Sequence, residues 1–220
     1  MSVPVSFLQD YGSEILRLTI EHSRLTAISV GAAILFSVPT GIILTRARKI
    51  AAPVLAFASI IQTIPSLALF GLVIPILIAV NLPIIGFVPA FIALFLYALL
   101  PILRNTHTGI RQVDPAIIEA ATGIGMTDRQ ILWRIELPLS MPVIMAGIRT
   151  STVISVGVAT LAALIGAGGL GELIFRGLRT INYKLMLAGA IPAAALAMFM
   201  DFLLGRAEIF LTPKGLKIKE

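Results

Sequence analysis

The sequence has no cysteine and few charged residues among its 220 positions. Without cysteine, the chain can form no disulfide and no cysteine-based metal or redox site. Only 13% of the residues are Asp, Glu, Lys or Arg, and 58% are hydrophobic. Soluble domains average about 25% charged and about 45–50% apolar residues. The composition therefore indicates an integral membrane protein.

The sequence also lacks the motifs of several function classes. No GxxxxGK[ST] pattern occurs, so the chain cannot itself cradle the phosphates of ATP as a P-loop protein does. His22 and His107 stand apart, without the spacing to other ligands that a metal site requires. The basic residues form no patch interleaved with aromatic side chains, which argues against nucleic acid as a partner. We therefore expect no catalytic residue, no metal and no cofactor.

Long hydrophobic runs divide the chain into expected membrane spans, each needing about 20 apolar residues to cross a hydrocarbon core of ~30 Å. The runs are 25–44, 50–80, 87–103, 139–165 and 185–204. Residues 1–24 are polar and mixed in charge, which favours an interfacial segment over a removable signal peptide. A glycine-rich external loop is expected at 166–183, and 205–220 form a basic tail. The sequence predicts an all-α integral membrane protein with five transmembrane helices, or six as the alternative.

The run at 50–80 is too long for one straight span and contains three prolines. We expect one span that is kinked near Gln62, Thr63, Pro65 and Ser66, because a proline inside a helix frees carbonyl groups from their hydrogen bonds. Two half-length segments that dip into the bilayer are the alternative. The break could expose polar backbone to a translocation pathway, as broken helices do in transporters, but a simple kink explains these residues at least as well.

Lys and Arg are unequally distributed between the two sets of loops. With the N-terminus outside, the inside segments contain 11 of the 17 Lys and Arg residues and the outside segments five, while Arg149 lies within the fourth span. The positive-inside rule then places the loop at 114–138 and the C-terminus in the cytoplasm.

A pair of short helices is expected at 114–138. Asp114 followed by Pro115 is typical of an N-cap with proline at the first helical position. Apolar side chains then recur at i, i+3, i+4 and i+7, which places them in one stripe. The stripe consists of Ile117, Ala120, Ala121 and Ile124. Gly123 and Gly125 end this helix, because glycine tolerates the left-handed conformation of a C-terminal cap.

The second helix of the pair is expected to begin at a capping box formed by Thr127 and Gln130. It should run through Trp133 to Leu137, with Pro138 opening the next span. We interpret the pair as a compact helix–turn–helix whose apolar stripe is suited to contact with another protein. The alternative is an amphipathic cap that packs only on the membrane helices of the same chain.

This loop resembles the EAA motif of permease subunits of bacterial ABC importers. The matching positions are Glu119, Ala120, Ala121, Gly125, Ile135, Leu137 and Pro138. The segments 61–72, 96–110 and 161–178 are similar to permeases that import glycine betaine, carnitine or choline. The resemblance implies a type I ABC importer permease fold over residues 25–204, in the cell membrane.

The resemblance also implies partners and roles. An importer of this class has two separate ATPase subunits, a second permease subunit (a copy or a paralogue) and an extracytoplasmic substrate-binding protein. The apolar stripe would lie in a groove on the ATPase, and Glu119 would orient the helix. A permease for another small solute, such as an amino acid, and an ATP-independent secondary transporter remain as alternatives.

One charge is expected deep in a span. Arg149 lies about ten residues into the fourth hydrophobic run, where a charged side chain is costly and usually faces protein or water. It could pair with Asp201 near the cytoplasmic end of the fifth span, or help to line the pathway. We favour a structural ion pair.

Overall fold

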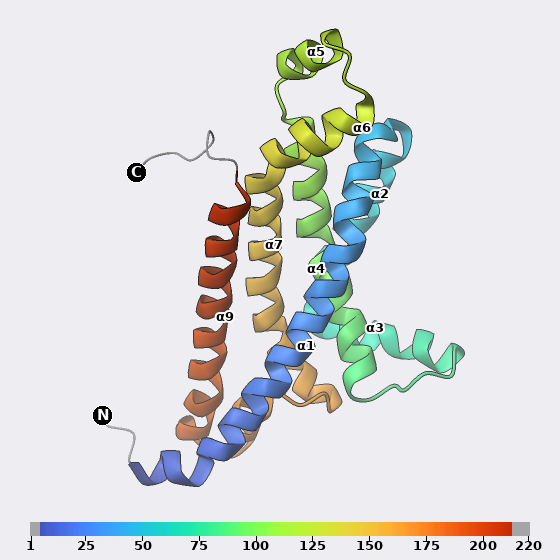
Figure 1. The fold of residues 1–220 in the computed structure, drawn as a ribbon. Helices are drawn as coiled ribbons and strands as arrows, with labels where there is room; N and C mark the ends of the chain where they lie inside the picture. Colours follow the sequence, from blue (N-terminus) through green and yellow to red (C-terminus); the bar gives the residue numbers. More distant parts are fainter. Residues whose placement is uncertain (1–4, 213–220) are drawn as a thin grey trace.

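The structure, a computed structural model, describes residues 5–212, with side chains from residue 11 onward. Within this range the regular secondary structure is entirely helical, which confirms the all-α prediction (Figure 1). The helices are α1 (Val5–Arg46), α2 (Arg48–Thr63), α3 (Ser66–Ala79), α4 (Phe87–Arg111), α5 (Pro115–Gly123), α6 (Asp128–Ile131), the π-helix η1 (Leu132–Glu136), α7 (Leu137–Ala159), the 3₁₀ helix η2 (Thr160–Ile165), α8 (Gly171–Arg179) and α9 (Tyr183–Leu211).

Four long helices form a bundle in which α4 packs against both α1 and α7, and α9 packs on α7. Its centre is a cluster of buried aliphatic side chains from α1, α4 and α7. The cluster contains Val30, Ala33, Ala98, Ile102, Ile144, Met145 and Ile148. At Gly147 a Cβ atom would lie only 2.8 Å from the Pro101 carbonyl oxygen, so this glycine allows α7 to approach α4 closely.

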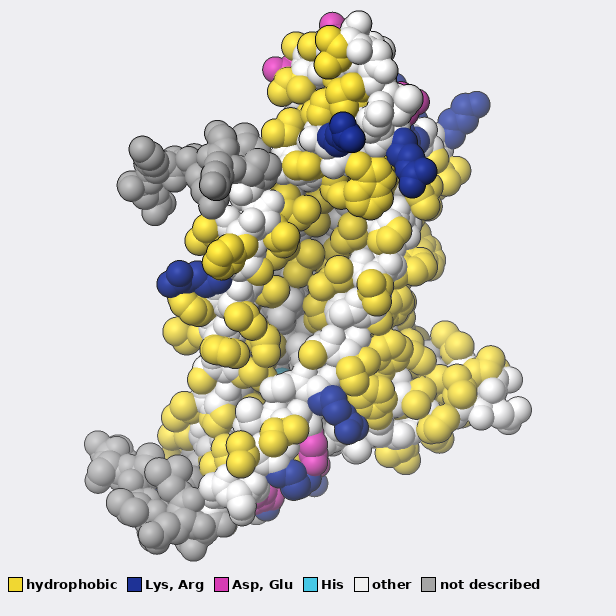
Figure 2. All heavy atoms as spheres, in the orientation of Figure 1, with side chains coloured by type: hydrophobic (Ala, Val, Ile, Leu, Met, Phe, Trp, Pro, Cys, Tyr) yellow, Lys and Arg dark blue, Asp and Glu magenta, His cyan; other side chains and the backbone are white. Residues whose placement is uncertain are grey.

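The four long helices are long and apolar enough to span a membrane, and a fifth span results if the bent pair α2–α3 counts as one. The spanning helices are Tyr11–Arg46, Phe87–Arg111, Asp128–Ile165 and Tyr183–Leu211. Each extends beyond the predicted apolar run at one end or both, because polar residues continue the helices. Hydrophobic side chains cover the middle of the face shown in Figure 2, and charged side chains lie mainly toward its two ends.

The helices continue without a break through two of the predicted domain boundaries, at residues 24 and 204. α1 passes residue 24 without a break, and the Arg17–Glu21 ion pair stabilises this turn at i,i+4 spacing. Likewise α9 continues past residue 204 to Leu211. The interfacial position of 1–24 and the cytoplasmic position of 205–220 stay predictions; residues 1–4 and 213–220 of these segments lie outside the described residues.

The chain breaks where a kink was predicted, and the break separates two helices, which agrees with one broken span and with two half-length segments. α2 and α3 are separate helices bent by 109° at Ile64 and Pro65. Ile64 is extended (φ −70°, ψ 127°), because a residue before proline is pushed out of the helical region. Its freed carbonyl accepts a hydrogen bond of 3.0 Å from the Tyr97 hydroxyl, which satisfies the carbonyl at a half-buried position, whereas Thr63 and Pro65 on either side are exposed.

The loop expected at 166–183 is also wrong in part, since it contains helix α8. The glycine-rich sequence suggested a loop, but α8 is an amphipathic helix whose Leu173 is fully buried. Arg176 of α8 pairs with Glu14 of α1, and the Gly169 amide donates a hydrogen bond to the Glu21 carboxylate. These contacts fix the segment against the start of α1.

Candidate coupling loop and charges within the bundle

Helix α5 begins as its sequence predicts and projects from one end of the bundle (Figure 1). The Asp114 side chain accepts a hydrogen bond of 2.9 Å from the Ala116 amide, and Pro115 occupies the first turn. Cap and proline together satisfy or remove amide groups that have no partner within the helix.

The predicted apolar stripe of α5 is divided between a buried and an exposed part. Ala121 is buried, whereas Ala120 and Glu119 are exposed. Ile117 and Ile124 are 42% and 80% exposed, which is unusual for large aliphatic side chains. Glu119 makes no hydrogen bond or ion pair with any described residue. α5 thus presents an apolar ridge and a free carboxylate to its surroundings.

The chain reverses direction after α5 at Gly125, whose φ of +84° favours glycine. A Cβ atom at this position would meet no atom within 4 Å, so the reversal is constrained by the backbone and not by crowding. Thr127 and Gln130 then form the predicted capping box: the Thr127 amide donates to Gln130 Oε1 at 2.9 Å, and the Gln130 amide donates to Thr127 Oγ1 at 3.4 Å.

The prediction of a separate second helix that ends at Leu137 is wrong. α6 continues through the π-helix η1 into α7, and Asp128–Ile165 forms one long helix. Pro138 has no amide hydrogen and is tolerated in the first turn of α7. The π-turn before it lets the Leu137 amide bond to the Leu132 carbonyl, so the helix passes the proline without ending.

Glu136 lies inside this junction and is a site residue that the sequence did not suggest. Its side chain is only 6% exposed and accepts a hydrogen bond of 2.5 Å from Arg46 at the end of α1. The ion pair connects the end of α1 to the π-helix η1, which follows the loop at 114–138. A lone acidic residue just before an apolar run was the one signal available for it.

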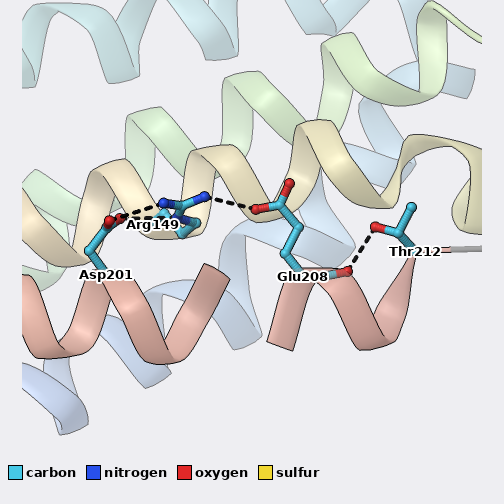
Figure 3. A network of polar contacts seen from close by, with 4 residues as sticks. All are labelled: Arg149, Asp201, Glu208 and Thr212. Atoms are coloured by element: carbon cyan, nitrogen blue, oxygen red, sulfur yellow. Dashed lines mark hydrogen bonds and ion pairs between the residues drawn. The ribbon is translucent and has the colours of Figure 1, made fainter. Parts of the chain in front are cut away.

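Arg149 and Asp201 lie together between α7 and α9, joined by two hydrogen bonds of 3.0 Å from Nε and Nη2 to the two carboxylate oxygens (Figure 3). Glu208 completes a triad, because its Oε2 accepts from Nη1 of Arg149 at 3.0 Å. Sequence reasoning missed Glu208, although it follows Asp201 by seven residues and therefore lies on the same face of α9.

A family described as the binding-protein-dependent transport system inner membrane component matches residues 37–208. The chain belongs to this family. The choline transport system permease protein OpuBB of Bacillus subtilis is 48% identical to this permease, over 98% of this chain and 97% of the relative. The osmoprotectant import permease protein OsmW of Salmonella typhimurium is 44% identical over 97% and 99% of the two chains.

Solved structures support the same fold. A chain of the MetNI methionine ABC transporter, in an inward-facing conformation, matches 97% of this permease and 100% of its own length with a TM-score of 0.81 at 24% identity. A chain of an amino acid ABC transporter solved with histidines matches 96% of this permease and 98% of its own length, with a TM-score of 0.72 at 19% identity. At these identities the likeness concerns the fold, which is that of ABC importer permeases.

The residues at the break between α2 and α3 lie apart from the triad of Arg149, Asp201 and Glu208. Thr63 Oγ1 donates to the Ile60 carbonyl within its own helix, and Gln62 and Ser66 are half-buried. None of these residues, and not Pro65, lines the surface hollow that Arg149 and Asp201 share with Ala146, Val153 and Met198. The structure therefore does not bring the break and the charged triad into one site.

Proposed function

We propose that the chain is the membrane-spanning subunit of an ATP-driven importer that moves a quaternary-ammonium osmolyte, such as glycine betaine, carnitine or choline, into the cytoplasm. Family membership and full-length relatives with transport names support this proposal. They favour it over a permease for an amino acid and over an ATP-independent transporter. ATP hydrolysis belongs to a separate ATPase, and the permease itself catalyses no reaction.

The observation that carries the coupling role is the exposure of α5. The helix packs mainly on α6, the outer turn of the long helix Asp128–Ile165. A cap over the bundle would instead pack across several of the long membrane helices. Its exposed Ile117 and Ile124, beside the free carboxylate of Glu119, form a ridge that can enter a groove on another protein. We assign this groove to the ATPase, and Glu119 contributes a charged contact that orients the helix.

The proposed complex has two ATPase subunits, a second permease subunit (this chain again or a paralogue) and an extracytoplasmic binding protein. α5 and the end of α9 lie at the same end of the bundle, opposite the start of α1 (Figure 1). The distribution of Lys and Arg supports a cytoplasmic position for that end. Nucleotide binding would then shift the permease between inward- and outward-open arrangements through rigid-body movement of the coupled helices.

Gly125→Trp tests the proposal. We expect the wild-type permease, purified from membranes of its native host, to bring an ATPase with it. The variant should lose at least about 90% of that partner, because tryptophan strains the left-handed reversal and its indole obstructs docking of the ridge. Partners are identified by mass spectrometry. Gly12→Trp in α1 controls for the bulk of an added indole, since a Cβ there also meets no atom within 4 Å and Gly12 lies near the start of α1.

Three outcomes would contradict parts of the proposal. Recovery of equal amounts of ATPase with wild type and Gly125→Trp would remove the docking role of this loop. Recovery of no ATPase with folded wild type would remove the importer assignment and favour an ATP-independent transporter. A binding protein that accompanies the wild type and binds an amino acid, but no betaine, carnitine or choline, would overturn the proposed substrate class.

A further inference from the structure

An open groove of about 360 Å³ lies on the surface of α6 and η1, at the end of the bundle that carries α5. Arg129 and Trp133 are four residues apart, and so are Gln130 and Arg134, which brings these side chains to one face of the helix. Ile131, which is only 3% exposed, turns the other face toward the bundle. The groove is lined by Thr127, Arg129, Gln130, Trp133 and Arg134.

The charged lining of this groove consists of two guanidinium groups and contains no carboxylate. Neither Arg129 nor Arg134 forms an ion pair with an acidic residue in the described part of the chain. Glu136 of η1 is buried and already paired with Arg46, and Asp128 does not line the groove. The groove therefore has two positive charges without a counterion of its own, which suits it to an anion.

Trp133 places this groove at the level of the membrane surface. The side chain is 59% exposed and lies four residues, about 6 Å along the helix, before α7 begins at Leu137. Tryptophan is enriched at the boundary between hydrocarbon and water, where its ring contacts acyl chains and its N–H group reaches polar headgroups. Lys and Arg side chains gather beside hydrophobic ones over this end of the molecule (Figure 2).

The groove is separate from the ridge that we assign to the ATPase. α5 projects farther from the bundle than α6 does (Figure 1). The ion pair between Arg46 and Glu136 holds η1 at the end of α1, and α6 and η1 continue directly into α7. The groove thus lies between the ridge of α5 and the long apolar helices, which is where lipid headgroups surround a membrane protein.

We propose that this groove binds the headgroup of an anionic phospholipid such as phosphatidylglycerol. Arg129 and Arg134 hold the phosphodiester, because guanidinium groups donate paired N–H groups to phosphate oxygens, and Trp133 contacts the acyl chains. A zwitterionic lipid also brings an ammonium group, and the groove has no carboxylate to receive it. This inference goes beyond the proposed function and needs only that the long helices span the membrane.

Trp133 is the single tryptophan of the chain, so its fluorescence reports on this groove directly. The test reconstitutes the whole chain, without other proteins, in bilayers of phosphatidylcholine and phosphatidylglycerol, with bromine on the acyl chains of one lipid at a time. Bromine quenches a nearby tryptophan, so the quenching by each lipid gives its relative affinity. We expect wild type to prefer phosphatidylglycerol by about tenfold or more, because each Arg beside an anionic lipid contributes about fivefold.

Two charge-matched double variants assign the preference to the groove. In Arg129→Gln/Arg134→Gln it should fall to within about twofold, while quenching by brominated phosphatidylcholine stays as in wild type and shows that Trp133 still contacts acyl chains. Arg48→Gln/Arg111→Gln is the control. It removes two exposed cations from the start of α2 and the end of α4, outside the groove, and should keep the full preference.

The proposal is overturned if wild type shows no preference for phosphatidylglycerol, if Arg129→Gln/Arg134→Gln keeps it, or if Arg48→Gln/Arg111→Gln loses it equally. It is also overturned if neither brominated lipid quenches Trp133, since the groove would then lie away from the bilayer. Displacement of the lipid by soluble glycerol phosphate would mean that the groove binds a free phosphate instead. Recovery of the ATPase tests the proposed function separately and does not depend on these results.

Discussion

Gly147→Val should lower the midpoint of thermal unfolding of the purified permease by about 6–12 °C, corresponding to about 3 kcal/mol for a chain of this size. At Gly147 a Cβ would lie 2.6 Å from Asn105 Cβ and 2.8 Å from the Pro101 carbonyl oxygen. The second contact is with backbone, which cannot move aside as the end of a flexible side chain can. α7 would have to separate from α4, and these two helices form the centre of the bundle.

Gly157→Val is the matched control on the same helix. A Cβ at Gly157 meets no atom within 4 Å, so this substitution should change the midpoint by less than about 2 °C. Thermal unfolding of both variants in detergent or nanodiscs, followed by loss of monodisperse protein, provides the comparison. Equal midpoints for the two variants would show that the approach of α7 to α4 is not as close as described.

Arg46→Leu should destabilise the permease more than Glu136→Leu, although both remove the same ion pair. Removing Arg46 leaves the Glu136 carboxylate, 6% exposed, without a partner at the junction of η1 and α7. We expect a loss of about 2 kcal/mol, below the usual cost of breaking a buried pair because Arg46 is itself half-exposed. Removing Glu136 leaves an arginine that can reach water, which costs little.

The double variant Arg46→Leu/Glu136→Leu distinguishes this explanation from a loss of packing around Arg46. If the unpaired carboxylate is the cause, the double variant should recover to within about 0.5 kcal/mol of Glu136→Leu. A double variant as unstable as Arg46→Leu would instead mean that packing of the arginine stem, and not the unpaired carboxylate, accounts for the lost stability. ATPase stimulation measured on the same variants would report whether this link between α1 and the loop also affects coupling.

The local features of the coupling loop were predictable because they depend on residues close together in the sequence. Asp114 with Pro115, and Thr127 with Gln130, form their caps from side chains two or three positions from the amides they satisfy. The reversal at Gly125 follows from the permissiveness of glycine. The break before Pro65 was located for the same reason, since proline restricts the residue that precedes it.

The size of that break and the course of the chain after the loop were not predictable. The break bends the chain by 109°, and its freed carbonyl is satisfied by Tyr97, 33 positions away from Ile64. The continuation of α6 into α7 depends on a π-turn, whereas a proline at 138 suggested a boundary. α8 was likewise not predictable from its glycine-rich sequence, because it is stabilised by contacts with distant helices, α9 and the Glu14 and Leu18 side chains of α1.

The sequence by itself determined that the chain is a helical membrane protein and where its hydrophobic runs lie, which follow from composition and periodicity. It also showed which loop resembles the EAA motif of ABC importer permeases. Only the tertiary structure decided that Glu136 meets Arg46, that Glu208 joins Arg149 and Asp201, and that Gly147 lies against a carbonyl of α4. Those contacts join residues 46 to 90 positions apart, and helix packing, which no local pattern specifies, brings them together.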